Sequence, residues 1–240
     1  MHVYANPARF LKIARPLTAW LGWAGAALIL GALGWGLSAA PTDYLQGESV
    51  RILYVHVPAA WLAMGGWTGI AVASLMQLVW RHPLAAVAAR AIAVPGAVFA
   101  FLCLATGSLW GRPTWGTYWE WDGRMTSMLV MLFLYLSFIA LASAEKEKGG
   151  EGRTTAIFGL VGAVNLPVIH YSVVWWNTLH QGQSISFVSA SSTIDSSMLW
   201  PLLASALGFT LLFGAVVLMR MRAELARTKV EARLKRMASE

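Results

Sequence analysis

Charged side chains are scarce in this sequence, since only 12% of its 240 residues are Asp, Glu, Lys or Arg. Soluble domains carry about one-quarter charged residues, so this chain cannot cover itself with a hydrated surface. Hydrophobic residues make up 58% of the chain, and the mean hydropathy is +0.59. The composition therefore excludes an ordinary soluble domain and indicates a membrane protein.

Cysteine is almost absent. The single thiol, Cys103, lies in an apolar block and is most simply explained as a small buried hydrophobe. One cysteine forms no intramolecular disulfide, no CxxC redox pair and no zinc cluster, which excludes thiol–disulfide chemistry. The sequence also has no GxxxxGKS or GxxxxGKT motif, so it does not predict a P-loop nucleotide site.

Apolar residues occur in six blocks, each long enough to cross the hydrocarbon core as a helix, which takes roughly 20 residues. We predict an all-α integral membrane protein with six transmembrane helices in one bundle, because the segments between the blocks leave no room for a soluble domain. The first block exceeds the about 7 to 15 apolar residues of a signal-peptide core, so we expect an uncleaved span. The predicted spans are approximately 17–38, 57–80, 91–110, 125–144, 154–176 and 199–219.

Lys and Arg are distributed unevenly between the two sides of the predicted bundle. Fifteen of the 18 lie in the N-terminal segment, in two loops and in the tail 220–240, all on one side. The other side has only Arg51, Arg112 and Arg124. The positive-inside rule then predicts that both termini are cytoplasmic. The net charge of +7 thus reflects topology rather than nucleic-acid binding, and the basic tail is expected to lie near anionic membrane lipid.

One of the outward loops is unusually rich in aromatic residues. It contains Trp115, Tyr118, Trp119 and Trp121, followed by Asp122. If this stretch is helical, Trp115, Trp119 and Asp122 share a face, which would form an apolar platform for a large planar ligand. An aromatic belt at the headgroup level explains the same residues, and the composition alone leaves both interpretations open.

Two polar residues beside this loop have two interpretations each. Asp122 directly precedes the fourth span and can N-cap it, which is compatible with a role in a site. Arg124 can anchor to lipid phosphate, or it can pair with a ligand carboxylate.

Two histidines are predicted on the same side as the aromatic loop: His56 at the start of the second span and His180 in the last outward loop. A lone histidine near the headgroups is usually structural, but two from different spans fit a pair of axial ligands to haem iron. His170 lies inside the fifth span, where an ionisable group is a functional hypothesis by default. No second histidine lies at its depth, so we do not expect a transmembrane two-histidine cytochrome, and we favour a neutral, structural His170.

Three stretches of the sequence resemble a known family: Tyr54–Ala60, Trp115–Arg124 and His170–Gly182. The tryptophan-rich stretch is similar to the WWD signature of membrane haem-handling proteins. Taken together, the three stretches resemble the CcmC (haem exporter protein C) family of cytochrome c maturation. Chain length, six spans and charge asymmetry agree along nearly the whole sequence.

The resemblance implies a non-enzymatic haem chaperone of the bacterial inner membrane, with haem b held transiently on the periplasmic face. His56 and His180 match the family's axial ligands, Arg51 and Arg124 are candidate partners for the haem propionates, and His170 is a possible secondary residue. The implied partners are the haem chaperone CcmE, the small subunit CcmD and the ABC-type CcmA/CcmB complex. The implied haem platform consists of Trp115, Tyr118, Trp119, Trp121 and Asp122.

Two other functions are alternatives. A cytochrome c synthase-type haem lyase has a similar motif, but those proteins are longer and carry additional spans and a second histidine pair. A haem transporter or channel would need a polar path across the membrane. Only Asn165, His170 and Ser172 on the fifth span keep that alternative open.

Overall fold

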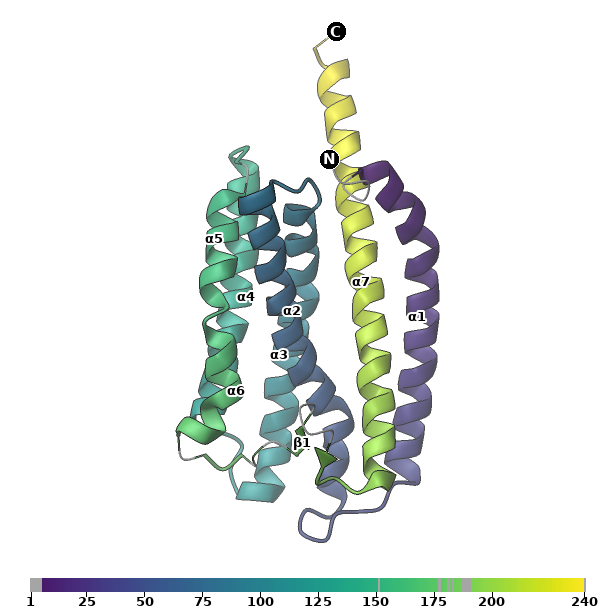
Figure 1. Ribbon diagram of the computed structural model, residues 1–240, viewed down its shortest axis with the longest axis vertical. Coiled ribbons are helices and arrows are strands. Elements are labelled where there is room, and N and C mark those ends of the chain that lie inside the picture. Colours follow the sequence, from purple (N-terminus) through teal and green to yellow (C-terminus); the bar gives the residue numbers. More distant parts are fainter. Residues whose placement is uncertain are drawn as a thin grey trace.

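The computed structural model describes residues 6–150, 152–176, 178–180, 182, 184–186 and 191–239. Within these residues, six helical segments are long and apolar enough to cross a membrane, which confirms the predicted number of spans. They stand side by side as one bundle (Figure 1). The elements are α1 (Pro7–Ser38), the 3₁₀ helix η2 (Glu48–Ile52), α2 (Leu53–Trp80), α3 (Ala85–Trp115), α4 (Gly123–Glu147), α5 (Arg153–Gly162), α6 (Asn165–Trp175), β1 (Ile185–Ser186), β2 (Ser191–Ser192) and α7 (Ser196–Met237).

The helices extend beyond the apolar blocks of the sequence. The third span continues to Trp115, and α7 runs on through the basic tail to Met237 as one helix of 42 residues. The fifth span is divided into α5 and α6 by a turn at residues 163–164. The side-chain amide of Asn165 fixes this break to α4, because it donates to the Ser127 carbonyl at 2.9 Å.

The two ends of the bundle carry different segments. The first turns of α1 and the last turns of α7 lie at the same end, the upper end in Figure 1. The opposite end carries segments 39–52 and 116–122 and the described residues of segment 176–195. We call the first the terminal end and the second the loop end. The aromatic loop and the last outward loop, which were predicted on one side, therefore do lie at the same end.

The main core lies where α2, α3, α4 and α5 meet. Trp67, Tyr135 and Phe138 are fully buried there, and the ring of Trp67 meets the other two edge-on at 4.9 and 6.0 Å. The hydroxyl of Tyr135 donates to the Ala63 carbonyl at 2.7 Å. A buried phenol needs such a partner, and this one joins α4 to α2.

α1 packs mainly against α7 (Figure 1). A Cβ on Gly25 would lie 2.8 Å from the backbone nitrogen of Leu212, and one on Gly208 would lie 2.9 Å from that of Ile29. Small residues allow two backbones to approach this closely, which is a common way for helices to associate in lipid. Since α7 also contacts α2 and α3, it joins α1 to the rest of the bundle.

A side chain of α7 binds a carbonyl group that a proline in α2 leaves without its helical partner. Pro58 has no N–H to donate to the carbonyl of Tyr54, four residues earlier. The hydroxyl of Ser205 donates to that oxygen at 2.6 Å, and Ser205 is fully buried. This bond fixes α7 to α2 in the first turns of α2, which also carry His56.

The same arrangement recurs nearer the terminal end. Pro95 in α3 cannot bond the carbonyl of Ala91, and the Nε of Arg220 on α7 donates to it at 3.1 Å. Hydrocarbon offers no water to satisfy a backbone group. The two prolines therefore create acceptors, and α7 supplies both donors.

Replacing Ser205 with Ala should lower the free energy of unfolding by about 1–2 kcal/mol, because it leaves the buried Tyr54 carbonyl without a donor. Unfolding of the purified protein by SDS in mixed micelles measures this change. Thr210→Ala on the same helix is the matched control. Its hydroxyl is exposed and bonds the Ala206 carbonyl within α7, so we expect little effect. Equal effects of the two variants would contradict the bridging role of Ser205.

Candidate functional site at the loop end

His56 lies in the first turn of α2 and its ring is held against α3. Its Nδ1 lies 3.0 Å from the Oγ1 of Thr106. The Thr106 hydroxyl donates its only hydrogen to the Leu102 carbonyl at 2.6 Å, so toward His56 it acts as the acceptor. The hydrogen of His56 is therefore on Nδ1, and Nε2 presents a lone pair.

Neighbouring residues fix the plane of the His56 ring. The ring of Trp110 meets it edge-on, with centroids 5.6 Å apart. A Cβ on Gly107 would lie 2.9 Å from the Cε1 of His56, so only glycine leaves room for the imidazole there. The Nε1 of Trp110 in turn donates to the Oε1 of Gln46 at 2.8 Å, which ties the loop before η2 to this wall.

Asp122 connects the start of α4 with the segment that carries His180. Its Oδ1 accepts the backbone N–H of Met125 at 2.7 Å, which confirms the predicted N-cap. Its Oδ2 accepts the hydroxyl of Thr178 and lies 2.8 Å from the Nδ1 of His180. Only 3% of the side chain is exposed. A single buried carboxylate thus holds two backbone segments together.

The carboxylate also determines the tautomer of His180. An ionised carboxylate only accepts hydrogen bonds, so the Nδ1 of His180 donates and Nε2 again presents its lone pair. The Thr178 Oγ1 accepts the backbone N–H of His180 at 3.1 Å, and the Trp115 ring lies 4.7 Å from the imidazole. A carboxylate behind a histidine is the usual way in which proteins orient a metal-binding imidazole.

The pKa values agree with this assignment. Burial raises the pKa of Asp122, but hydrogen bonds from Thr178, the Met125 N–H and His180 outweigh it and hold the pKa below its usual value. Burial lowers the pKa of His180 below its ordinary 6.5, and Asp122 only partly offsets this effect. As the pH falls through 6.5, the unfolded chain therefore binds the His180 proton before the folded chain does, and stability decreases. His180 is neutral at pH 7.

His56, His180 and Arg124 lie close enough for their charges to interact. Two imidazoles from different elements thus share one region at the loop end. Among the residues that the structure describes, no group of three or more His, Cys, Asp or Glu side chains could hold a bare metal ion. Two imidazoles instead suit a metal that brings its other ligands with it, as porphyrin iron does.

The aromatic stretch is not helical after Trp115. Gly116 adopts φ +81° and ends α3, so the expected helical face shared by Trp115, Trp119 and Asp122 does not exist. Asp122 and Trp115 nevertheless meet at His180. The Nε1 of Trp119 is buried and has no hydrogen-bond partner in the described part of the chain.

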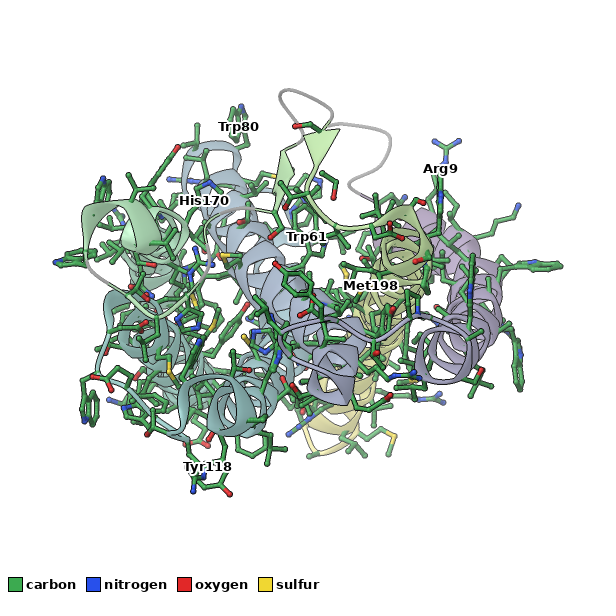
Figure 2. The ribbon with its side chains drawn as sticks, turned by 90° about the horizontal axis from the view of Figure 1, so that it is seen from below. Arg9, Trp61, Trp80, Tyr118, His170 and Met198 are labelled. Carbon is green, nitrogen blue, oxygen red and sulfur yellow. The ribbon has the colours of Figure 1, made fainter. Side chains whose placement is uncertain are left out.

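The outer aromatic residues are more exposed. The ring of Trp121 meets that of Trp119 at 5.3 Å, but 74% of Trp121 is exposed. Tyr118 is 56% exposed, has the guanidinium of Arg112 over its ring and points outward at the margin of the bundle (Figure 2). The sequence-predicted platform therefore divides into an inner part near His180 and an outer part.

The two arginines proposed as propionate partners have different surroundings. Arg51 lies in η2 and forms an ion pair with Glu48 at 2.7 Å. Arg124 lies in the first turn of α4, and its Nε donates to the Ser172 hydroxyl at 3.4 Å. It also donates to the backbone carbonyl of His170 at 3.3 Å, which joins α4 to α6.

The side chain of His170 is exposed on α6, and its ring meets that of Tyr171 edge-on at 4.7 Å. Viewed from the loop end, His170 lies well apart from Tyr118 (Figure 2). The structure therefore does not bring His170 together with the outer part of the aromatic stretch.

Sequence reasoning missed several residues that shape the site. Thr106, Gly107 and Trp110 lie on one stretch of α3 and form the wall around His56. Thr178 and Gln46 act through hydrogen bonds from loops. Nothing in the pattern of the third span shows that this stretch faces His56.

Known proteins are similar to this chain over nearly its whole length. The family model described as Heme exporter protein C matches residues 1–236. The chain belongs to this family. A protein named Heme exporter protein C from Bradyrhizobium diazoefficiens is 52% identical over 229 residues, which are 95% of this chain and 86% of the relative. The Escherichia coli K12 protein of that name is 47% identical over 92% of this chain and 89% of its own length. One from Paracoccus denitrificans is 39% identical, with coverage of 97% and 96%.

Membership of the Heme exporter protein C family confirms the resemblance drawn from the three sequence stretches. Together with the six apolar helices, it identifies a multi-pass membrane protein. This chain covers at least 86% of the length of each of these three relatives.

Replacing Asp122 with Asn should lower the pKa of His180 further, because the imidazolium loses a neighbouring negative charge. It should also weaken the preference for the Nδ1–H tautomer. NMR titration of the protein with ¹⁵N-labelled imidazoles measures both quantities. Asp195→Asn is the matched control, since Asp195 N-caps α7 at the same end and should leave His180 unchanged. A wild-type His180 pKa above 6.5 would contradict the burial argument.

Proposed function

We propose that this protein holds haem at the loop end, with His56 and His180 as axial ligands, and delivers it to a partner protein. The Heme exporter protein C family implies a role in haem handling for cytochrome c maturation. The assignment of these two histidines as axial ligands is supported by the tautomer that they have in common. Each donates its Nδ1–H within the protein and presents the Nε2 lone pair, which is the form that binds iron.

The inner aromatic residues fit the porphyrin part of the ligand. Trp115 lies against His180, and Trp119, whose ring meets that of the outer residue Trp121, would add a second indole to the platform. Haem would bring four porphyrin nitrogens to the iron, so the protein needs to supply only two ligands. The unpaired Nε1–H of Trp119 is a donor to the bound molecule. Tyr118 would act at the outer edge of this platform.

Arg124 is the better supported partner for a haem propionate. Its charge acts on both histidines, so it lies in the same region as the proposed ligands. Arg51 is also proposed as a propionate partner, but its ion pair with Glu48 would have to break before it could bind a propionate. We assign no direct role in haem binding to His170.

The orientation of the protein is part of the proposal. The Lys and Arg distribution supports a cytoplasmic terminal end and a periplasmic loop end in the bacterial inner membrane. Haem b would then be held at the periplasmic face. The basic end of α7 would lie on the cytoplasmic side, near anionic lipid.

Delivery to CcmE, with CcmD and the CcmA/CcmB complex as associated proteins, is proposed from the family resemblance. The two ligands belong to different elements, since His56 is on α2 and His180 is on a loop. We therefore expect the iron to be released in two steps, with the loop histidine leaving first. Because one ligand can leave before the other, the partner gains access to the iron while haem is still held.

Holding and delivery account for the structure better than a haem channel does. Two of the three side chains that kept a polar path open make contacts within the bundle instead, and the side chain of the third, His170, is exposed. Asn165 bonds the Ser127 carbonyl, and the buried Ser172 bonds the Ile169 carbonyl. A haem lyase is the other alternative, and no contact in the described structure favours it.

Replacing both His56 and His180 with Ala should abolish the Soret absorption of the protein purified with haem, because the iron loses both axial ligands. Each single variant should keep a weaker, shifted band. His82→Ala is the matched control, since His82 follows α2 at the terminal end and should leave the spectrum unchanged. A full Soret band in the double variant would remove both residues as ligands.

Replacing Trp119 and Trp121 with Ala should weaken haem retention about tenfold, since each ring contact contributes roughly 0.5–1.5 kcal/mol. Haem transfer to excess apomyoglobin measures the rate of loss. The control removes two exposed tryptophans of α1, Trp20 and Trp23, and should not alter that rate. If both double variants lose haem as slowly as the wild type, the aromatic stretch is a membrane belt.

A further inference from the structure

A cavity of about 360 Å³ lies at the terminal end, far from the two histidines. It is formed between α3, α4 and α7. Apolar and charged residues line it in separate zones. The charged zone consists of Arg90, Lys146, Arg220, Arg227 and Glu224.

The positive charges of this zone exceed the negative ones. Glu224 is the only carboxylate among the described lining residues, and it pairs with Lys146 at 2.7 Å and with Arg90 at 3.3 Å. Arg227 pairs with Glu231, outside the lining, at 2.7 Å. Even when Glu231 is counted, four cations face two carboxylates. The cavity therefore attracts an anion.

Arg90 also has an unmet hydrogen bond. Its Nε is buried, and no acceptor bonds it among the residues the structure describes. A buried donor without a partner is costly, and near the hydrocarbon core water offers little compensation. An anionic oxygen bound in the cavity would satisfy it.

The apolar zone lies deeper in the bundle than the charges. α4 ends at the terminal end, so Phe138, Ile139 and Ala142 come one to two turns before Lys146. α3 begins at that end, so Val94 lies one turn deeper than Arg90. The order from the boundary inward is thus cationic and then apolar, which is the order of groups in an anionic phospholipid.

We propose that this cavity binds an anionic phospholipid. The phosphate lies among Arg90, Lys146 and the exposed Arg227, and the first part of an acyl chain packs on the half-buried Val94 and Ile139. Clusters of basic residues between transmembrane helices are suited to such headgroups. The bound lipid would join α3, α4 and α7 at the end opposite the histidines. The apolar zone distinguishes it from a site for free phosphate, which has no chain to bury.

Native mass spectrometry of the full chain released from detergent tests this assignment. The protein is mixed with equal amounts of phosphatidylglycerol and phosphatidylethanolamine. We expect the wild type to retain phosphatidylglycerol preferentially. The double variant Arg90→Gln and Arg227→Gln should reduce that adduct about tenfold, because it removes two cations facing the phosphate. Binding of phosphatidylethanolamine should not change.

The matched control is Arg233→Gln with Arg236→Gln, which removes two exposed arginines of α7 outside the cavity. It should retain the phosphatidylglycerol adduct. Equal losses in both double variants would overturn the site in favour of a general charge effect. Displacement of the adduct by millimolar inorganic phosphate would show a free-anion site instead, and equal retention of both lipids by the wild type would overturn the proposal.

A second variant keeps the test valid if the double variant does not fold. Arg227 is 70% exposed at its side chain, so Arg227→Gln alone should preserve the fold and reduce the adduct about threefold. The Soret band of the haem-loaded protein reports on the loop end in each variant. Loss of the lipid adduct with an unchanged Soret band, or the reverse, therefore distinguishes failure of the lipid proposal from failure of the haem proposal.

Discussion

A backbone carbonyl inside a membrane needs a hydrogen-bond donor from within the protein. In this bundle, α7 bonds α2 and α3 at the two carbonyls that have lost their helical donor to a proline. Pro58 and Pro95 each leave one carbonyl without its helical N–H. Ser205 and Arg220, both on α7, donate to these oxygens. Because α7 also packs closely on α1 through glycines, one helix fixes the relative positions of α1, α2 and α3. The candidate site at the loop end and the cavity at the terminal end both depend on that arrangement.

Asp122 has a similar connecting role at the loop end. Its two carboxylate oxygens face different segments, one toward the first turn of α4 and the other toward Thr178 and His180. The charge that stabilises the helix start therefore also selects the tautomer of the imidazole. His56 reaches the same tautomer by another route, through the hydroxyl of Thr106. Two unrelated local environments thus produce imidazoles of matching chemistry.

The six spans could be predicted from the sequence because burial in hydrocarbon demands long apolar runs, and the described part of the chain contains six such helices. The cap by Asp122 was also visible, since capping depends on a residue's immediate neighbours. The wall around His56 was not visible, because Thr106 and Trp110 belong to a span whose rotation depends on packing with α2. The shared helical face of the aromatic stretch depended on that stretch being helical, and this condition is not met because α3 ends at Trp115 and Gly116 follows it. Glycine commonly terminates helices, so Gly116 was the residue in the sequence from which the end of this helix could have been predicted.

The uninterrupted course of α7 has a mechanical consequence. Its 42 residues correspond to a rod of about 63 Å, roughly twice the thickness of the hydrocarbon layer. Such a helix cannot rotate about its axis at one end while the other end stays fixed, unless the helix itself twists. A torque applied to the projecting basic segment therefore reaches Arg220 first and then Ser205, whose hydroxyl bonds the carbonyl of Tyr54, two residues before His56 on α2.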